Sequence, residues 1–181
     1  MIRGMMVLAG VLLLAGCAEE DVKTYTVEKA PPTEAHAHAS GELLWETPDG
    51  WTASEGSSMR LASFSVPGPE GVNSGDCSII VLGGDGGGLV PNVNRWRGQI
   101  GLDGASEEAI LAASREETGG LGEYRIFRLV NPDNADAAFL VAMIPGGART
   151  LFVKLAGPVG LVDSADDAFV GLCRSLRESD S

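Results

Sequence analysis

The sequence has few of the side chains on which catalysis and nucleic-acid binding depend. Its 181 residues include two histidines, and 13 Lys or Arg side chains against 25 Asp or Glu give a formal net charge of −12. Proteins that bind nucleic acids or anionic membrane surfaces use Lys and Arg to neutralise phosphates, so this balance argues against both. The apolar fraction of 44% is enough for a packed core and excludes an acidic disordered chain. One domain is the expected number at this length.

The scarcity of basic side chains also limits the chemistry of the segment that is expected to fold. Both histidines, His36 and His38, lie in a stretch typical of a linker, and Lys154 is the only lysine after it. A Ser-His-Asp or Cys-His set is therefore excluded inside the domain, and a Ser-Lys pair would depend on a single lysine. His36 and His38 with Glu34 could chelate a transition metal, but a linker would hold it weakly. We expect no enzyme, no cofactor and no metal site.

The N-terminus has the pattern of an export signal. Arg3 precedes an apolar stretch of ten residues, from Met5 to Leu14. This is half of the ~20 residues that span a bilayer, so it indicates a signal segment and not a stable anchor. The residues Leu14, Ala15, Gly16 and Cys17 follow, and this run resembles the lipobox of bacterial lipoproteins.

The lipobox resemblance implies cleavage between Gly16 and Cys17 and a lipid on the new N-terminus. The thiol of Cys17 would carry a diacylglyceryl group as a thioether, and two or more acyl chains bind a membrane firmly where one does not. Residue 18 is Ala and not Asp, which by resemblance to the sorting pattern of two-membrane bacteria favours the outer over the inner membrane. The alternative is an ordinary secretory signal in which Cys17 is incidental.

The rest of the chain divides into a tether and a single domain. Residues 17–40 contain Ala, Pro and polar side chains without apolar periodicity, which is typical of a flexible linker. Residues 41–181 form the expected domain, which is large enough to fold around its own core.

Hydrophobic periodicity and turn signals predict an α+β domain, with an antiparallel β-sheet packed against helices. Strands are expected at 42–45, 59–66, 77–82, 122–130, 137–144 and 149–156. Helices are expected from about Pro91 to Gly101, from Ser106 to Ala113, and from Leu161 to Arg177. The last three strands are joined by short turns, which makes them antiparallel, and the almost wholly apolar segment 137–144 indicates a central strand.

The glycine-rich segment 83–88 superficially resembles a phosphate-binding loop. It lacks the Gly-Lys-Ser/Thr ending of such a loop, and Asp85 within it would repel phosphate. A flexible connection is the preferred interpretation.

Two cysteines remain in the domain once Cys17 is assigned to the lipid. Cys77 lies in a predicted strand, and Cys173 lies on the apolar side of the predicted C-terminal helix. An exported protein meets an oxidising compartment, so the two form a candidate disulfide. The alternative is a pair of buried thiols that act as small hydrophobic residues.

The segment around Arg95, Arg97 and Gln99 is the best candidate for a binding site. Arg95 and Gln99 are four residues apart and share one face of the predicted helix. The three side chains could line a groove for an anionic ligand or for the acidic patch of a partner protein. Alternatively, the arginines pair with nearby acids such as Glu107 or Glu108 and have only a structural role.

Four segments of the domain, in order, resemble a group of uncharacterised bacterial lipoproteins whose domain is similar to the Mog1/PsbP fold. The segments are 47–51, 59–64, 92–102 and 152–158, and the resemblance extends over residues 43–177. The Asn-Arg-Trp-Arg-x-Gln run at 94–99 is its most specific part. The resemblance implies a fold and no particular activity, although many proteins of this fold act by docking on other proteins.

These observations lead to a functional expectation with two alternatives. The chain is expected to be a lipid-anchored protein of the bacterial cell envelope, a non-enzymatic module that binds or helps to assemble another envelope protein. The first alternative is a lipoprotein that binds a small ligand in a cleft between the sheet and the helix at 91–101. The second is an enzyme that uses only carboxylates and arginine. It is disfavoured because the acidic pairs at 116–117 and 166–167 fit solvated loops and helix faces.

Overall fold

The structure, a computed structural model, describes residues 43–55 and 58–179. The predicted signal peptide at 1–16, Cys17 and the rest of the tether to residue 40 lie outside the described residues. None of the helices within these two described ranges is long and apolar enough to cross a membrane.

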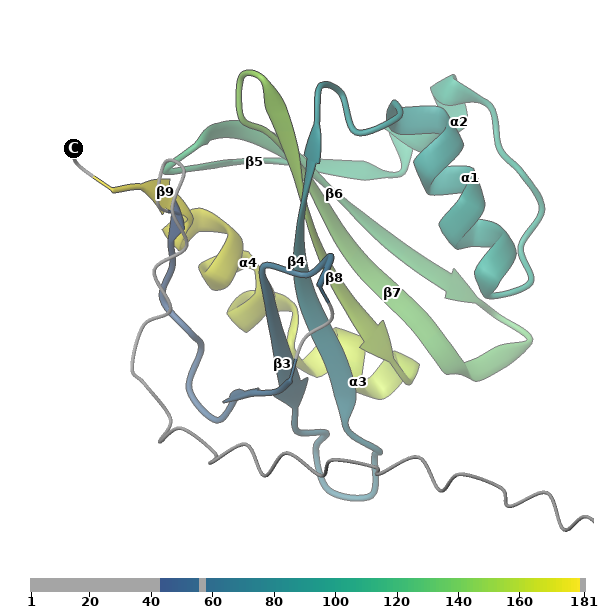
Figure 1. Ribbon diagram of the computed structural model, residues 1–181. Helices are drawn as coiled ribbons and strands as arrows, with labels where there is room; N and C mark the ends of the chain where they lie inside the picture. The colour runs from purple at the N-terminus through teal and green to yellow at the C-terminus, as the bar shows by residue number, and fades with distance from the viewer. Residues whose placement is uncertain (1–42, 56–57, 180–181) are drawn as a thin grey trace, which may run out of the picture. The chain divides into compact units, whose positions relative to one another are not determined.

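In the part of the chain that the structure describes, seven strands form one sheet in the order β2-β3-β4-β8-β7-β6-β5, and every neighbouring pair is antiparallel (Figure 1). The strands are β2 (Thr52–Ala53), β3 (Ala62–Val66), β4 (Gly75–Gly83), β5 (Ser114–Gly119), β6 (Gly122–Asn131), β7 (Asn134–Pro145) and β8 (Arg149–Gly157). A separate antiparallel pair joins β1 (Leu43–Leu44) to β9 (Arg177–Glu178). The predicted α+β class with an antiparallel sheet is confirmed.

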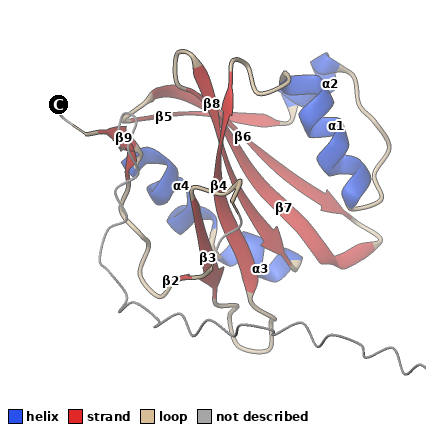
Figure 2. Cartoon of the chain, in the orientation of Figure 1, coloured by secondary structure: helices blue, strands red, loops and turns tan. Residues whose placement is uncertain are grey.

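Within the described residues, four helices lie on the two faces of the sheet (Figure 2). They are α1 (Leu89–Gln99), α2 (Glu107–Ala112), α3 (Val159–Ser164) and α4 (Asp166–Ser175). Helices α3 and α4 share the larger core with the sheet, where Phe169 and Leu172 pack near Ile79 and Leu155. Helices α1 and α2 share a second core with β6, β7 and β8 on the opposite face, where Trp96 meets Phe152 edge-on with ring centroids 5.9 Å apart.

Strand β7 shows why the sheet needs both helical layers. Successive side chains of a strand point to opposite faces, and β7 is apolar on both. Leu140, Ala142 and Ile144 belong to the core under α3 and α4, whereas Val141 and Met143 belong to the core under α1 and α2. The prediction of a central strand at 137–144 is therefore confirmed.

Two local predictions were wrong. Residues Glu116 and Glu117 lie on the edge strand β5, which the sequence analysis missed because its run of charged residues lacks the alternation of a half-buried strand. The single helix predicted at 161–177 is two helices. The chain turns at Ala165 (φ −96°, ψ 2°) and leaves the helical conformation at Leu176 (φ −61°, ψ 123°). The turn allows both short helices to bury their apolar residues against the same sheet face.

The larger core supplies a direct test of the arrangement. Phe169 of α4 has 0% exposure, so we expect Phe169→Ala to lower the free energy of unfolding by about 3–5 kcal/mol, through lost burial and the cavity left behind. Chemical denaturation measures this loss. Asp167→Ala, an exposed position on the same helix, serves as the control and should change stability by no more than about 1 kcal/mol. Equal effects at both positions would contradict the placement of α4.

Candidate functional site

The sheet face beneath α1 and α2 changes from apolar to polar along its width. The register places Phe127, Val141, Lys154, Ser78 and Ser63 side by side, one on each strand from β6 to β3. The core under the two helices includes Phe127 and Val141 but no residue of β2 or β3. Helices α1 and α2 therefore cover only part of this face (Figure 2), and the side chains become polar where the cover ends.

Lys154 lies at this boundary and is the centre of the candidate site. Its Nζ donates a hydrogen bond to Oε1 of Gln99 at 2.9 Å and lies 3.6 Å from the ring centroid of Phe139. Burial, together with the nearby positive charges of Arg95 and Arg60, lowers the pKa of Lys154 from 10.5 to about 8, against a smaller opposite effect of Asp76. A positive charge is thus held where solvent does little to stabilise it.

Arg60 and Arg95 bring two further positive charges to the site. Arg60 forms an ion pair with Asp76 at 2.9 Å. Arg95 is exposed and donates to Oδ1 of Asn92 at 2.8 Å. None of the ion pairs among the described residues involves Arg95 or Lys154. We call Arg60, Arg95, Lys154, Gln99 and Asp76 the cationic site.

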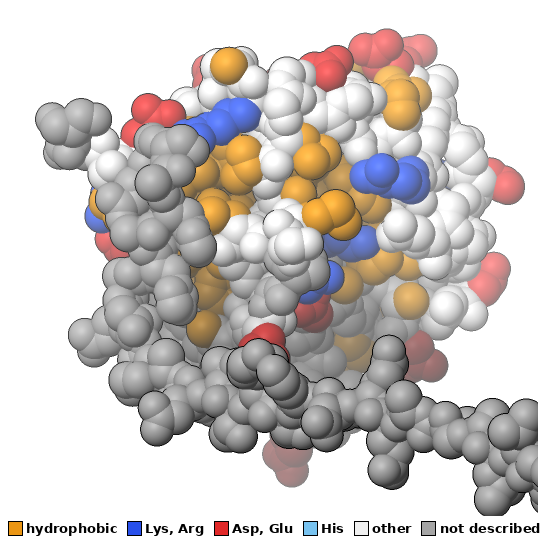
Figure 3. Space-filling model, in the orientation of Figure 1, with side chains coloured by type: hydrophobic (Ala, Val, Ile, Leu, Met, Phe, Trp, Pro, Cys, Tyr) orange, Lys and Arg blue, Asp and Glu red, His pale blue; other side chains and the backbone are white. Residues whose placement is uncertain are grey.

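The cationic site contrasts with the rest of the molecule. Three positive charges and one carboxylate give it an excess of positive charge within a chain of net charge −12. Figure 3 shows Lys and Arg side chains lying among hydrophobic ones on the visible face, whereas Asp and Glu lie mainly around its edge. An excess of unpaired cations on an acidic protein favours an anionic ligand or partner.

The glycine-rich loop before α1 helps to position Arg95. The side-chain amide of Asn92 donates to the carbonyls of Gly86 (3.0 Å) and Gly88 (2.6 Å), while its Oδ1 accepts from Arg95. Gly86 has φ +63°, and a Cβ there would lie 2.5 Å from the ring of Phe152, so a side chain would not fit. The loop expected to be a flexible connection is therefore tied to α1 by these hydrogen bonds.

The structure brings together only two of the three residues predicted to line a groove. Arg95 and Gln99 both face the cationic site, but Arg97 lies on the other side of α1, where its Nε donates to the carbonyl of Asp103 at 2.8 Å. Residues two apart on a helix point in nearly opposite directions, which explains the separation. Neither arginine forms an ion pair with Glu107 or Glu108 in the part of the chain that the structure describes.

The sequence analysis missed three members of the site: Lys154, Arg60 and Asp76. One signal was present, because Lys154 is the only charged residue in the otherwise apolar segment 151–156 of a strand with buried neighbours. The Arg60–Asp76 ion pair depends on the β3–β4 register, which brings Arg60, just before β3, within 2.9 Å of Asp76 on β4. That register was not predicted.

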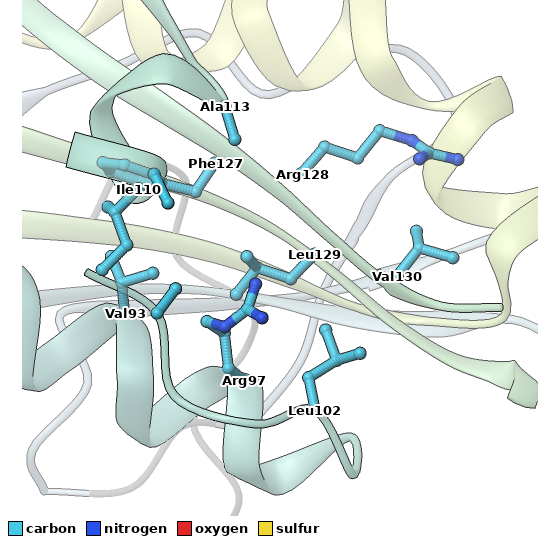
Figure 4. Close-up of a pocket in the computed structure, with 11 residues that line it drawn as sticks. Val93, Arg97, Leu102, Ile110, Ala113, Phe127, Arg128, Leu129 and Val130 are labelled. Carbon is cyan, nitrogen blue, oxygen red and sulfur yellow. The ribbon is translucent and has the colours of Figure 1, made fainter. Parts of the chain in front are cut away.

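A hollow of about 200 Å³ lies beside Arg97, between α1, α2 and β6 (Figure 4). Its lining is mostly apolar and comprises Val93, Leu102, Ala105, Ala109, Ile110, Ala113, Phe127, Leu129 and Val130, with Arg97 and Arg128. Figure 4 shows Arg128 extending away from the apolar side chains, in keeping with its 2.7 Å ion pair to Asp163 of α3. Arg97 is thus the polar group of this hollow that has no carboxylate partner among the described residues.

On the other face of the sheet, charges at the β5 edge are balanced. Glu117 forms ion pairs with Arg115 (3.2 Å) and Arg174 (2.6 Å), and Arg115 also binds Asp166 (3.0 Å). The neighbouring hydroxyl of Tyr124 is buried without a hydrogen-bond partner in the described structure, and burial raises the pKa of Tyr124 to about 12. Because each of these carboxylates is neutralised by arginine, the cluster does not resemble an acid-base pair of an enzyme.

Cys77 and Cys173 both lie in the core under α3 and α4 as buried thiols. Burial raises the pKa of both, with a further contribution from Asp76 for Cys77 and from Cys77 for Cys173. The effect of Cys77 on the pKa of Cys173 means that strand β4 and helix α4 bring the two thiols near each other. Their pairing as a disulfide stays a prediction.

Comparison with known proteins yields a distant structural likeness. No protein-family model matches the sequence, and no curated protein matches it. The chain resembles a solved protein from Bacteroides thetaiotaomicron with 13% identity and a TM-score of 0.46, over 77% of this chain and 46% of that one. It also resembles the cyanobacterial PsbP protein CyanoP from Synechocystis with 13% identity and a TM-score of 0.44, over 83% of this chain and 100% of that one.

A PsbP protein is thus among the solved structures that this chain resembles. The chain spans less than half of the Bacteroides protein, at 46%. With TM-scores of 0.46 and 0.44, neither likeness carries information about activity or partners.

The pKa of Lys154 leads to a pH-dependent difference in stability. The folded protein releases the Lys154 proton from about pH 8, whereas the unfolded chain keeps it to about 10.5. The unfolded state binds more protons in this window, so the contribution of Lys154 to stability rises with pH there. We therefore compare the free energy of unfolding of the wild type with that of Lys154→Met. Between pH 8 and 10.5 the difference should change by about 1 kcal/mol in favour of the wild type, after allowance for solvent screening. Urea denaturation of both proteins measures it, and a pH-independent difference would contradict the half-buried charge.

The two buried thiols lead to a second prediction. The thiolate is the reactive form of cysteine, so we expect Cys77 and Cys173 to resist alkylation at about pH 8 in the folded protein. They should react after unfolding in a reductant. Mass spectrometry counts the added groups, and a mass that increases by two hydrogen atoms on reduction demonstrates the disulfide. Rapid alkylation of both residues in the folded protein would contradict their burial.

Proposed function

We propose that this protein is a lipid-anchored module of the bacterial cell envelope that binds another envelope protein through the cationic site. One observation supports this proposal most. Lys154 and Arg95 are positive charges without a carboxylate partner among the described residues, on a chain of net charge −12. The half-buried charge of Lys154 destabilises the isolated fold unless a partner compensates it, and the exposed charge of Arg95 is free to attract the same partner. The module acts by binding and not by catalysis.

The lipid anchor belongs to the same proposal. Cys17, with Leu14, Ala15 and Gly16 before it, carries the acyl chains, and residues 17–40 link it to the domain. Outer-membrane sorting follows from Ala18. Anchoring confines the domain to the membrane surface and raises its effective concentration near partners there, so a small binding site suffices.

A small-ligand-binding lipoprotein is the second candidate function, and the hollow beside Arg97 is the observation that favours it. Small-molecule sites usually have volumes of about 300–1,000 Å³ and enclose most of the ligand. The hollow measures about 200 Å³. Lys154, Arg95 and Arg60 are not among the residues that line this hollow. The unpaired charges and the hollow are therefore separate features, and the charges favour a protein partner.

Co-purification of the native lipoprotein from its own membranes in mild detergent tests the proposed function. We expect a stoichiometric protein partner with the wild type. Loss of the anchor in Cys17→Ala should reduce its recovery several-fold, and so should Arg95→Gln, because its positive charge is removed from the cationic site.

Arg97→Gln is the matched control, since it makes the same change on the same helix outside the cationic site. It should leave recovery of the partner unchanged. A wild-type protein that purifies without any partner would overturn the proposed function. Equal losses with Arg95→Gln and Arg97→Gln would move the binding surface away from the cationic site.

A further inference from the structure

We infer that the group recognised by the cationic site is a carboxylate on an acidic segment of the partner protein, bound jointly by Lys154 and Arg95. This inference rests on the proposed docking function and adds to it the chemistry of the partner. It follows from the hydrogen bonds that the three cations make in the structure.

The three cations of the site do not have equivalent partners. Arg60 binds the carboxylate of Asp76 at 2.9 Å. Lys154 and Arg95 instead donate to amide oxygens, those of Gln99 at 2.9 Å and Asn92 at 2.8 Å. A carboxylate carries a full negative charge, whereas an amide oxygen carries only a partial one, so a cation is attracted more strongly to the carboxylate. A carboxylate would therefore be a better acceptor than the amide oxygens that now occupy these donors.

Lys154 and Arg95 are near enough to share one carboxylate. Gln99 contacts Lys154 directly and follows Arg95 by one turn of α1, and residues four apart on a helix are neighbours. The positive charge of Arg95 also lowers the pKa of Lys154. A carboxylate between the two would remove this repulsion, so its binding and the protonation of Lys154 reinforce each other.

The surroundings of the site favour a protein segment over a small anion. Arg95 and Gln99 are exposed, and the cationic site lies outside the hollow beside Arg97. A site that does not enclose its ligand gives a small molecule little burial. Three cations are also too few for a polyphosphate or an anionic membrane, which engage larger basic clusters.

Exposed apolar side chains near the site indicate what accompanies the carboxylate. Among the described residues, Met59 (78% exposed) and Leu82 (41%) are the exposed large hydrophobic side chains. Met59 directly precedes Arg60, and Leu82 alternates with Ile80 and Ser78 on the same face of β4. These two side chains are the reason to place an apolar residue between the acidic ones in the peptide that tests the site.

The lysine content makes the test unusually direct. The sequence has three lysines, and Lys23 and Lys29 lie in the tether outside the cationic site. NMR of the lipidated protein in detergent, labelled at its lysines with ¹³C, can therefore follow Lys154 separately. The probe is a blocked peptide with the sequence Gly-Glu-Leu-Glu-Gly, and its matched control is the same peptide with Gln in place of Glu. Inorganic phosphate and phosphatidylglycerol vesicles form two further arms.

We expect the Glu peptide to raise the pKa of Lys154 by about one unit, which corresponds to affinity about tenfold weaker once the lysine is deprotonated. The signals of Lys23 and Lys29 should not move. Arg95→Gln should weaken binding at least about threefold, whereas Arg97→Gln should not. Lys154→Met, in which the titrating group is absent, should abolish the pH dependence of peptide binding measured by calorimetry.

Several outcomes would overturn the inference. One is a Gln peptide that acts as strongly as the Glu peptide, and another is a Glu peptide that leaves Lys154 unchanged at millimolar concentration. An equal or larger effect of phosphate or of the vesicles would assign the site to a free anion or to lipid. Co-purification separates this failure from that of the proposed function. A partner still captured by Lys154→Met but lost with Arg95→Gln would reject joint binding of a carboxylate by Lys154 and Arg95 and leave docking at the cationic site intact.

Discussion

The helices cover the two faces of the sheet to different extents, and the rest of the structure depends on this constraint. A seven-stranded sheet with apolar side chains on both faces must be shielded from water on both. Helices α3 and α4 share one large core with the sheet, and their apolar partners extend to β3 and β4. Helices α1 and α2 have 11 and 6 residues, and their core reaches no further than β4. The remaining strip of that face has to be polar, and there the cations collect.

The position of α1 converts this strip into a site. The helix is fixed on one side by Trp96 in the core and at its start by Asn92, which ties it to the glycine-rich loop. Its solvent-facing residues Arg95 and Gln99 are thereby held next to Lys154. Structural order and an unfavourable charge thus have the same origin, because the packing that orders α1 also removes water from Lys154.

Sequence patterns predicted the parts of the fold that depend on local periodicity. The strands from 122 to 156 and the helix containing Trp96 have strong apolar alternation or a clear helical repeat, and the structure confirms them. Strand β5 was not predicted because an edge strand needs no apolar alternation. The break between two helices at Ala165 was not predicted because the helical repeat of apolar residues continues through it. For the site, helical spacing paired Arg95 with Gln99. Lys154 and Arg60 join them only through strand register and tertiary packing, which periodicity does not specify.

The topology also determines the order in which the sheet can assemble. Strands β5 to β8 follow one another in sequence as hairpins, and each contact between them closes a short loop. Strand β4 pairs instead with β8. Asp76 therefore comes next to Ala156 only when the long segment of chain between them closes into a loop. Loop closure over such a distance is slow because its entropy is lost before any contact compensates. Contact order therefore favours early formation of β5 to β8, and we expect docking of the β3–β4 hairpin onto β8 to be the slower event that completes the cationic site.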